Sequence, residues 1–271
     1  MPEIPELEAV RAYFNVHIAG KAILSAGTRI PVVFRTPAAE LRETLPGDAF
    51  AETSRRGKFL LINLASGRVL AVNPMLTGRF QFVPPGTRLA AKTCLVLGVE
   101  GDRHLRYVDE RLMGKVYLLP ADALGAIPGW TKNGPDLMDP ALTEEEWLRR
   151  LRKHRGQVKA ILTNAEFVQG IGNAYSDEIL WEARVNPYTA RTALAVEDLR
   201  RLFAAAREVM ARATPLVAAA MTRDGNLDYE ERRDFMQVHR RGGQPCPRCG
   251  APITEITANQ RITSFCRTCQ P

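Results

Sequence analysis

The chain has 271 residues, 45% hydrophobic and 25% charged, which is ordinary for a folded globular protein and long enough for two domains, or for one with an appendage. Its net charge of +7 favours a polyanionic partner, although a basic solvated surface would give the same balance. No apolar run reaches membrane-spanning length, and MPEIPELEAV lacks the basic start and apolar core of a signal peptide. We therefore expect a cytoplasmic protein without a membrane partner.

The first half of the chain predicts one helix followed by strands. Leu7, Val10 and Phe14 recur at helical spacing, and Gly20 is a natural end for that helix. From about residue 21 to 119, short segments rich in Val, Ile, Leu, Phe and Tyr alternate with turn signals such as Ser66-Gly67. Short strands at hairpin spacing favour an antiparallel β-sandwich.

The second half predicts helices. Residues 125–140 are rich in proline and glycine and are interpreted as a linker. Thr143 and Glu146 then form a capping box at the start of a helix. Further helices are expected through 157–164, 170–185 and 196–213, and the polar segment 222–235 is expected to be a mobile loop.

Four of the five cysteines lie in two Cys-x2-Cys pairs near the C-terminus, separated by sixteen residues. Four thiolates in two close pairs can enclose a tetrahedral Zn²⁺ with no open position, which is typical of a structural site. The intervening segment alternates like a β-hairpin, so we expect a small zinc finger; its minimal role would be to staple the terminus. Cys94 is interpreted as a buried apolar residue of a strand. The predicted zinc ligands are Cys246, Cys249, Cys266 and Cys269.

Three weaker patterns have both a functional and an ordinary interpretation. In QGIGNAYSDE, Gly170, Gly172 and Asn173 can form a phosphate site at a helix start, or simply a turn with an Asn cap. Lys58 begins an apolar strand, where an ammonium can be partly desolvated or can extend to solvent. Pro2 with its neighbouring acids suits the first turn of any helix.

Taken together and in this order, PEIPE, RRGKFLL, GIGNAYSDEIL and the cysteine pairs around QRIT resemble the formamidopyrimidine-DNA glycosylase and endonuclease VIII family, closer to the formamidopyrimidine branch. The resemblance covers nearly the whole chain. It implies an α+β, multidomain fold: an N-terminal helix on an antiparallel β-sandwich, a helix–two-turn–helix domain and a C-terminal β-hairpin zinc finger. We place these domains at residues 1–130, 131–243 and 244–271.

The resemblance also implies a mechanism. After removal of Met1, the secondary amine of Pro2 would attack C1′ of a flipped, damaged nucleotide and form a Schiff base, and β,δ-elimination would then cut the strand. Glu3 would serve as acid and base, with Glu6 supporting the helix start. Lys58 and Arg261 would bind phosphate and assist catalysis. Asn173 and Lys159 would add DNA contacts. The expected cofactor is one structural Zn²⁺, and the expected partner of a monomeric enzyme is damaged double-stranded DNA.

Two motifs depart from the family pattern. The chain has NPMLTG (73–78) where the family usually has His-Leu-Gly-Met-Ser/Thr-Gly, and DERLMG (109–114) where it usually has Asp-Pro-Arg-Arg-Phe-Gly. By the resemblance, Leu76, Arg111 and Met113 match the residues that fill the gap left by the flipped nucleotide. The apolar wedges remain, but the aromatic stack is lost.

Several functions fit these patterns. Our first expectation is a bifunctional DNA glycosylase and abasic-site lyase for oxidised purines, associated with the nucleoid when bound to DNA. The altered wedge leaves oxidised pyrimidines or other lesions as an alternative. A non-catalytic lesion or DNA-structure binder would also keep the fold and the finger, but it would not need Pro2, Glu3 and Lys58 together. A zinc-stapled scaffold without nucleic acid explains the basic charge poorly.

Overall fold

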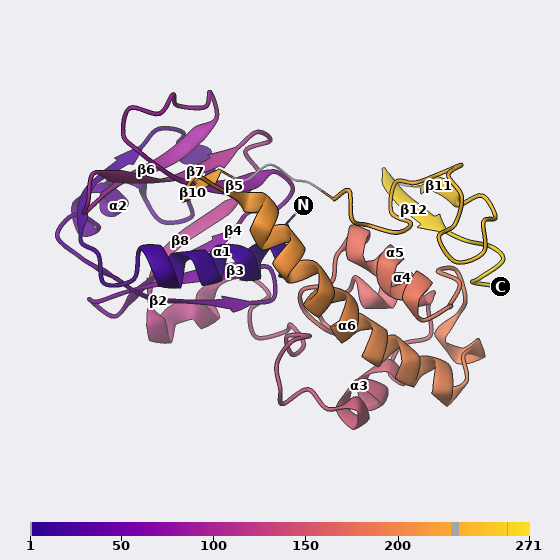
Figure 1. The fold of residues 1–271 in the computed structure, drawn as a ribbon. Coiled ribbons are helices and arrows are strands. Elements are labelled where there is room, and N and C mark those ends of the chain that lie inside the picture. The colour runs from indigo at the N-terminus through magenta and orange to yellow at the C-terminus, as the bar shows by residue number, and fades with distance from the viewer. Residues whose placement is uncertain (1, 229–232, 259) are drawn as a thin grey trace. The chain divides into compact units, whose positions relative to one another are not determined.

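The computed structural model describes residues 2–228, 233–258 and 260–271. The chain divides into two compact units, shown as a ribbon in Figure 1. The first unit contains residues up to 131 and returns for residues 214–232, of which the last four lie outside the described part. The second contains residues 132–213 and 233–271. The domain boundaries expected from the sequence stay a prediction.

A six-stranded antiparallel sheet forms one layer of the first unit, in the order β1-β6-β7-β5-β10-β9. Strands β5 and β7 of this sheet are well buried, and their large side chains Phe80, Phe82 and Tyr107 lie in the core. The strand bounds are β1 Ile23–Thr28, β5 Gly78–Val83, β6 Thr93–Val99, β7 Arg103–Asp109, β9 Thr222–Arg223 and β10 Asn226–Asp228.

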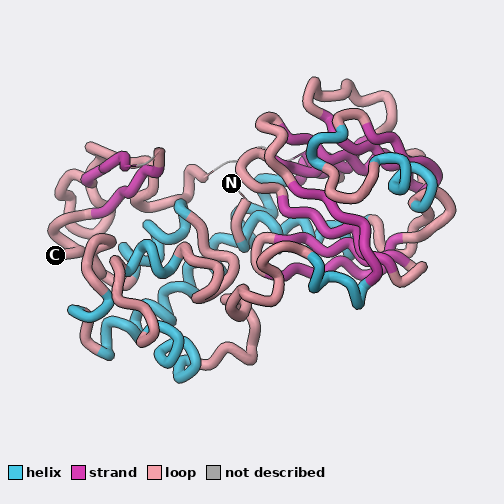
Figure 2. The backbone as a smooth tube through the Cα atoms, turned by 180° about the vertical axis from the view of Figure 1, so that it is seen from behind, coloured by secondary structure: helices cyan, strands magenta, loops and turns pink. Residues whose placement is uncertain are grey.

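A four-stranded antiparallel sheet forms the other layer, in the order β2-β3-β4-β8, and both layers are visible in the tube view of Figure 2. Its strands are β2 Phe50–Arg56, β3 Phe59–Leu64, β4 Arg68–Asn73 and β8 Lys115–Pro120. Both faces are buried. On one face Phe59 and Leu61 pack with Ile127 and Trp130, which follow the 3-10 helix η2 (Ala121–Ala126). Because side chains alternate along a strand, Leu60 points to the other face.

Helix α1 (Ile4–His17) contacts both sheets of the first unit. Phe14 packs edge-to-face on Phe80 of β5, with ring centroids 5.4 Å apart. Asn15 makes two hydrogen bonds to the backbone of Thr53 in β2: its Nδ2 donates to the carbonyl oxygen over 2.9 Å, and its Oδ1 accepts from the amide over 2.7 Å. These contacts fix the helix against the sandwich. Two short helices complete this unit, η1 (Pro31–Val33) and α2 (Ala38–Thr44).

Helices build the second unit. They are α3 (Glu144–Leu151), α4 (Val158–Leu162), α5 (Asn173–Glu182), the short η3 (Arg191–Ala193) and most of α6 (Val196–Met221). The Thr143 hydroxyl accepts a hydrogen bond from the amide of Glu146, which is the predicted cap of α3. Trp147 is fully buried and stacks edge-on against Phe167, with its Nε1 donating to the carbonyl of Leu199. This indole therefore ties α3 to α6.

The C-terminal segment forms the hairpin β11 (Thr254–Ala258) and β12 (Arg261–Phe265), paired antiparallel with Ala258 opposite Arg261. The expected α+β architecture, with a helix on a β-sandwich, a helical domain and a β-hairpin finger, is confirmed. Within the described residues, no helix has the length and apolar character needed to cross a membrane.

Two expectations about residues 196–235 were wrong. The fourth helix does not end near residue 213 but continues past Pro215 to Met221. Within the segment 222–235, which was expected to be a mobile loop, Thr222–Arg223 and Asn226–Asp228 form β9 and β10, while residues 229–232 lie outside the described part of the chain. The physical reason is burial: Leu227, the one large apolar residue between Thr222 and Asp228, is fully buried where β10 pairs with Phe82 of β5.

Replacing Leu227 with Ala should destabilise the first unit by about 2 to 5 kcal/mol, because it removes a buried side chain that anchors β10. The measurement is the urea unfolding midpoint, together with amide hydrogen exchange in residues 78–83. Thr222→Ala, at an exposed position of the same hairpin, should change stability by less than about 0.5 kcal/mol. Equal effects of the two substitutions would contradict an anchoring role.

Candidate active site, nucleic-acid interface and metal centre

The start of α1 is fixed by a reciprocal pair of hydrogen bonds between Glu3 and Glu6. The backbone amide of Glu3 donates to Glu6 Oε2 over 2.8 Å, and the Glu3 side chain accepts from the backbone amide of Glu6. Both side chains are almost completely buried, and Pro5 occupies the first turn. Pro2, which immediately precedes this pair, is buried as well. The chain end is therefore held in the fold.

Pro2 lies at the wall of a small, partly open recess. The recess is lined mainly by apolar side chains from α1, β5 and the end of α6, together with the predicted loop 73–78. The residues around it are Pro2, Glu6, Leu7, Val10, Pro74, Gly78, Arg79, Phe80 and Met221, all of them in the first unit.

Lys58 lies on the turn between β2 and β3 and is partly exposed. The preceding residues tie this turn to α1. Arg55, whose side chain is 3% exposed, donates through Nε to Glu8 over 2.7 Å and through Nη1 to the carbonyl of Gly57 over 2.8 Å. Glu8 is one helical turn beyond Pro5. The ion pair therefore links the helix that begins after Pro2 to the turn that carries Lys58.

Three predicted gap-filling residues lie on two loops of the first unit. Leu76 is partly exposed, Arg111 is exposed, and the side chain of Met113 is 42% exposed. The loop of Leu76 leads into β5 and the loop of Arg111 and Met113 follows β7, which pairs with β5. The structure thus brings these three residues to one end of the same strand pair.

In the second unit, Asn173 and Lys159 bind the backbone of β12 beside Arg261, which lies at the tip of the finger hairpin opposite Ala258. Asn173 Nδ2, in the first turn of α5, donates to the carbonyl oxygen of Ile262 over 2.8 Å. Lys159 Nζ donates to the same carbonyl over 3.1 Å and to Asp177 Oδ1 over 2.6 Å. Arg261 is exposed at the start of β12, next to Ile262. Asn173 and Lys159 therefore hold the strand that presents Arg261.

Two buried acids of α5 complete this attachment, and the sequence analysis missed both. Asp177 Oδ2 accepts from the backbone amide of Ser264 over 3.1 Å and lies 2.7 Å from Nδ1 of His239. Glu178 accepts from three consecutive backbone amides, those of residues 237, 238 and 239. Burial raises the pKa of Glu178, while these three amides oppose the rise. The signal in the sequence was an acidic pair directly before the apolar residues Ile179, Leu180 and Trp181.

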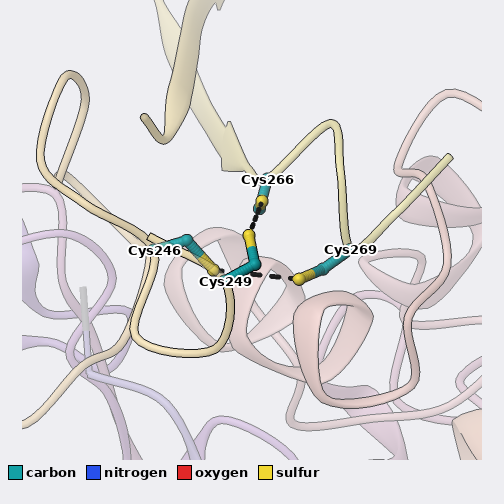
Figure 3. Close-up of side chains that lie close together, drawn as sticks. All are labelled: Cys246, Cys249, Cys266 and Cys269. Carbon is teal, nitrogen blue, oxygen red and sulfur yellow. Dashed lines mark hydrogen bonds between the residues drawn. The ribbon is translucent and has the colours of Figure 1, made fainter. Parts of the chain in front are cut away.

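The four predicted zinc ligands converge, as Figure 3 shows. The sulfur atoms of Cys246, Cys249, Cys266 and Cys269 all lie within 4.8 Å of one another. Trp181 of α5 donates from Nε1 to Cys246 Sγ over 3.5 Å. Burial raises the pKa of Cys246, but hydrogen bonds from Trp181 and from the amides of Arg248 and Cys249 outweigh it and lower that pKa to about 6. Four close sulfur donors fit a tetrahedral zinc ion.

Family models match the chain in three consecutive parts. They are the N-terminal domain of formamidopyrimidine-DNA glycosylase at residues 1–116, its H2TH domain at 134–223, and the zinc finger found in FPG and IleRS at 243–271. A formamidopyrimidine-DNA glycosylase of Pelotomaculum thermopropionicum is 33% identical over 100% of this chain and 99% of its own length. The chain belongs to the formamidopyrimidine-DNA glycosylase family.

Other relatives agree with this assignment. The formamidopyrimidine-DNA glycosylase of Symbiobacterium thermophilum is 32% identical over 100% of this chain and 90% of its own length. Among solved structures, a complex between the Lactococcus lactis Fpg and DNA containing an abasic site matches with a TM-score of 0.90 and 28% identity over 99% of both chains. Another complex of that protein, with DNA containing FAPY-dG, has a TM-score of 0.89 and 28% identity, again over 99% of both chains.

Within this family, the cysteine cluster is the site of one structural zinc ion, in agreement with the expected cofactor. The ion would be held by the four thiolates and would leave no position open for substrate. Trp181 and Arg248, whose guanidinium lies 3.7 Å from the indole centroid, connect this centre to α5. Helix α5 thus contacts the finger at two places, its metal centre and the strand β12 that carries Arg261.

Replacing Cys246 with Ser should release zinc and increase hydrogen exchange in residues 237–239 and 262–265, because metal binding supplies much of the folding energy of so small a finger. The measurements are metal analysis of the purified protein and exchange followed by mass spectrometry. Cys94→Ala, which removes the remaining thiol from a buried strand, should leave the zinc content unchanged. Full zinc occupancy in Cys246→Ser would refute the assigned ligand set.

Proposed function

We propose that the chain is a bifunctional DNA glycosylase and abasic-site lyase that excises oxidised bases from duplex DNA, with oxidised purines such as 8-oxoguanine and formamidopyrimidines as its first substrates. DNA glycosylase activity on damaged DNA follows from the family. The finer activity depends on one observation: Pro2 lies at the wall of a recess, at the start of a helix whose first turn is buried and capped.

The proposed reaction begins at the nitrogen of Pro2. Once Met1 is removed, the lone pair of this secondary amine attacks C1′, and the bond between C1′ and the damaged base breaks as the base takes up a proton. The amine nitrogen loses its proton, the C1′–O4′ bond breaks with O4′ taking up a proton, and the opened sugar is left as an iminium between C1′ and Pro2. The iminium carries a positive charge, so a proton leaves C2′ readily and the C3′–O bond breaks. A second elimination then breaks the C5′–O bond. The positive end of the α1 dipole disfavours the protonated amine and so favours attack.

Glu3 and Lys58 are the proposed partners of Pro2. The Glu3 carboxyl group is adjacent in the chain to the nucleophile and is the acid and base for departure of the base and opening of the sugar. Lys58 supplies positive charge for a phosphate beside the lesion. Its turn is tied to α1 through Arg55 and Glu8, which supports a fixed distance between Lys58 and Pro2.

We propose that Arg261 binds a DNA phosphate through its planar guanidinium. Asn173 and Lys159 contribute to the same site by holding the carbonyl of Ile262, in addition to any phosphate contact of their own. The partner is damaged double-stranded DNA, as in the Lactococcus lactis complexes that this chain resembles. We further propose a monomer in the cytoplasm, bound to the nucleoid when engaged with DNA.

Leu76, Arg111 and Met113 are proposed to fill the gap left by the flipped nucleotide, with Arg111 facing the orphaned base. Because this chain has no aromatic wedge at Met113, oxidised pyrimidines are the second candidate class of substrate. A non-catalytic lesion binder on the same fold is disfavoured, because DNA binding alone does not require a buried proline at the wall of a recess.

Borohydride should trap a covalent adduct between the protein and a duplex with an abasic site, and Pro2→Gly should lower the yield by about tenfold or more, because the secondary amine is lost. Intact-mass analysis of the same samples should show removal of Met1. Pro84→Ala, which keeps the terminal proline and changes an exposed residue of the same unit, should trap like the parent. Duplex binding without any trapped adduct would favour the non-catalytic binder.

Replacing Arg261 with Ala should weaken duplex binding and flatten the dependence of log affinity on log salt concentration by about 0.9, the value for one lost phosphate contact. The measurement is the affinity for duplex DNA by fluorescence anisotropy, at salt concentrations from about 50 to 200 mM. Arg267→Ala removes another exposed arginine of the finger and serves as the control. An identical slope change in both variants would indicate general charge rather than a contact at Arg261.

A further inference from the structure

The two proposed gap-filling loops emerge at the same end of one strand pair. β5 begins at Gly78 and β7 ends at Asp109, and these two residues face each other in the antiparallel register. The segment before Gly78 and the segment after Asp109 must therefore run side by side. The first carries Leu76, and the second carries Arg111 and Met113.

Hydrogen bonds join these loops through two side chains that the proposed mechanism does not use. The Thr77 hydroxyl donates to Asp109 Oδ1 over 2.5 Å and accepts from the backbone amide of Arg111 over 2.9 Å. Asp109 Oδ2 accepts from the backbone amide of Gly114 over 2.6 Å. The Asp109 carboxylate is fully buried, and charge-assisted hydrogen bonds of this kind are strong and directional. The Asp109 carboxylate, at the start of loop 109–114, therefore binds the end of the same loop at Gly114 and the end of loop 73–78 at Thr77.

Tyr107 packs between the loops and leaves no space for a side chain at either glycine. A Cβ at Gly78 would lie 2.2 Å from the Tyr107 hydroxyl oxygen, and a Cβ at Gly114 would lie 1.9 Å from it. Among the side chains of the described residues, this hydroxyl is buried without a hydrogen-bond partner. Both loops therefore pack against the Tyr107 side chain through glycine backbone, at positions where any larger residue would clash with the hydroxyl.

Each loop also contains a residue with left-handed backbone. Met75 has φ +51° and precedes Leu76, while Leu112 has φ +54° and lies between Arg111 and Met113. Non-glycine residues adopt this conformation rarely, and it persists where the surrounding contacts determine it. The backbone amide of Met75 donates to Asn73 Oδ1 over 3.0 Å, and the backbone amide of Leu112 donates to the carbonyl oxygen of Asp109 over 3.2 Å.

We propose that residues 73–78 and 109–114 form a single latch, in which the Thr77 hydroxyl and the Asp109 carboxylate are positioning residues that hold Leu76, Arg111 and Met113 in one arrangement. This inference rests on the proposed gap-filling role of those three residues. It has a specific consequence: insertion of Leu76 and recognition of the orphaned base by Arg111 occur together. Loss of the hydroxyl therefore impairs discrimination between opposite bases, and not only the rate.

The latch is also continuous with the recess at Pro2. Pro74 and Gly78 of the first loop line that recess, and so does Arg79. Arg79 Nη2 in turn lies 3.1 Å from Oε1 of Glu110 in the second loop. The arrangement of the two loops is thus part of the wall that faces the nucleophile.

The test is Thr77→Val, which keeps the shape of the side chain but cannot donate or accept, with Thr77→Ser as the variant that restores the hydroxyl. The matched control is Thr36→Val in the same unit. Its hydroxyl also donates to one carbonyl and accepts from one amide, both of Leu118, in a different part of the sandwich. The substrates are duplexes with a preformed abasic site opposite C, A, G or T. The readouts are single-turnover borohydride trapping and the fluorescence of 2-aminopurine placed opposite the site.

We expect Thr77→Val to reduce the ratio of trapping rates between the best and worst opposite bases by about tenfold, and to weaken the fluorescence change. Thr77→Ser should restore both, and Thr36→Val should change neither. A parent-like ratio in Thr77→Val, or an equal loss in Thr36→Val, would overturn the latch. If the parent itself traps no duplex, the proposed function fails instead, so the two failures are distinguishable.

Discussion

The position of Pro2 depends on the reciprocal hydrogen bonds between Glu3 and Glu6. A chain terminus is normally the least ordered part of a domain, because few contacts offset the conformational entropy of its residues. Here the helix begins only two residues after Pro2, and its first turn is capped, buried and joined to β2 through Glu8 and Arg55. Without this anchorage Pro2 would have no defined position at the wall of the recess beside the start of β5.

In the second unit, α5 has the corresponding role. Its first turn holds the hairpin strand through Asn173, its middle holds the preceding segment through Asp177 and Glu178, and its last turn contacts the metal centre through Trp181. The metal centre and the strand that presents Arg261 are therefore attached to a single helix. A structural zinc ion can in this way determine where the side chain of Arg261 lies, which we propose binds a DNA phosphate.

Sequence patterns predicted the elements that depend on local chemistry. The cap at Thr143, the cysteine pairs and the apolar strands were all recognisable because each follows from the residue itself or from its near neighbours. The predictions failed where the structure of a segment depends on contacts with residues far away in the sequence. The polar segment around Leu227 forms a strand only because β5 offers it an unpaired edge, and Trp130 in the expected linker is buried against β3.

The candidate site shows the same division. The roles of Asp109 and Asp177 could not be inferred, because a buried acid is distinguished from a surface acid only by amides and hydroxyls that come from other parts of the chain. Lys159 was expected to face DNA, and whether it does so stays a prediction. The residues next to Lys159 in the sequence do not indicate that its ammonium group is surrounded by Asp177, Ile262 and Thr263.

The return of the chain to its first unit at residue 214 has a consequence for biosynthesis. The ribosome delivers β5 well before β10, so during translation the edge of the nascent sheet next to Phe82 has no neighbour until the whole of α6 has been made. An uncovered apolar edge of this kind is a template for pairing with another polypeptide. The N-terminal unit of this protein is therefore most exposed to misassembly while its own last strand is still being synthesised.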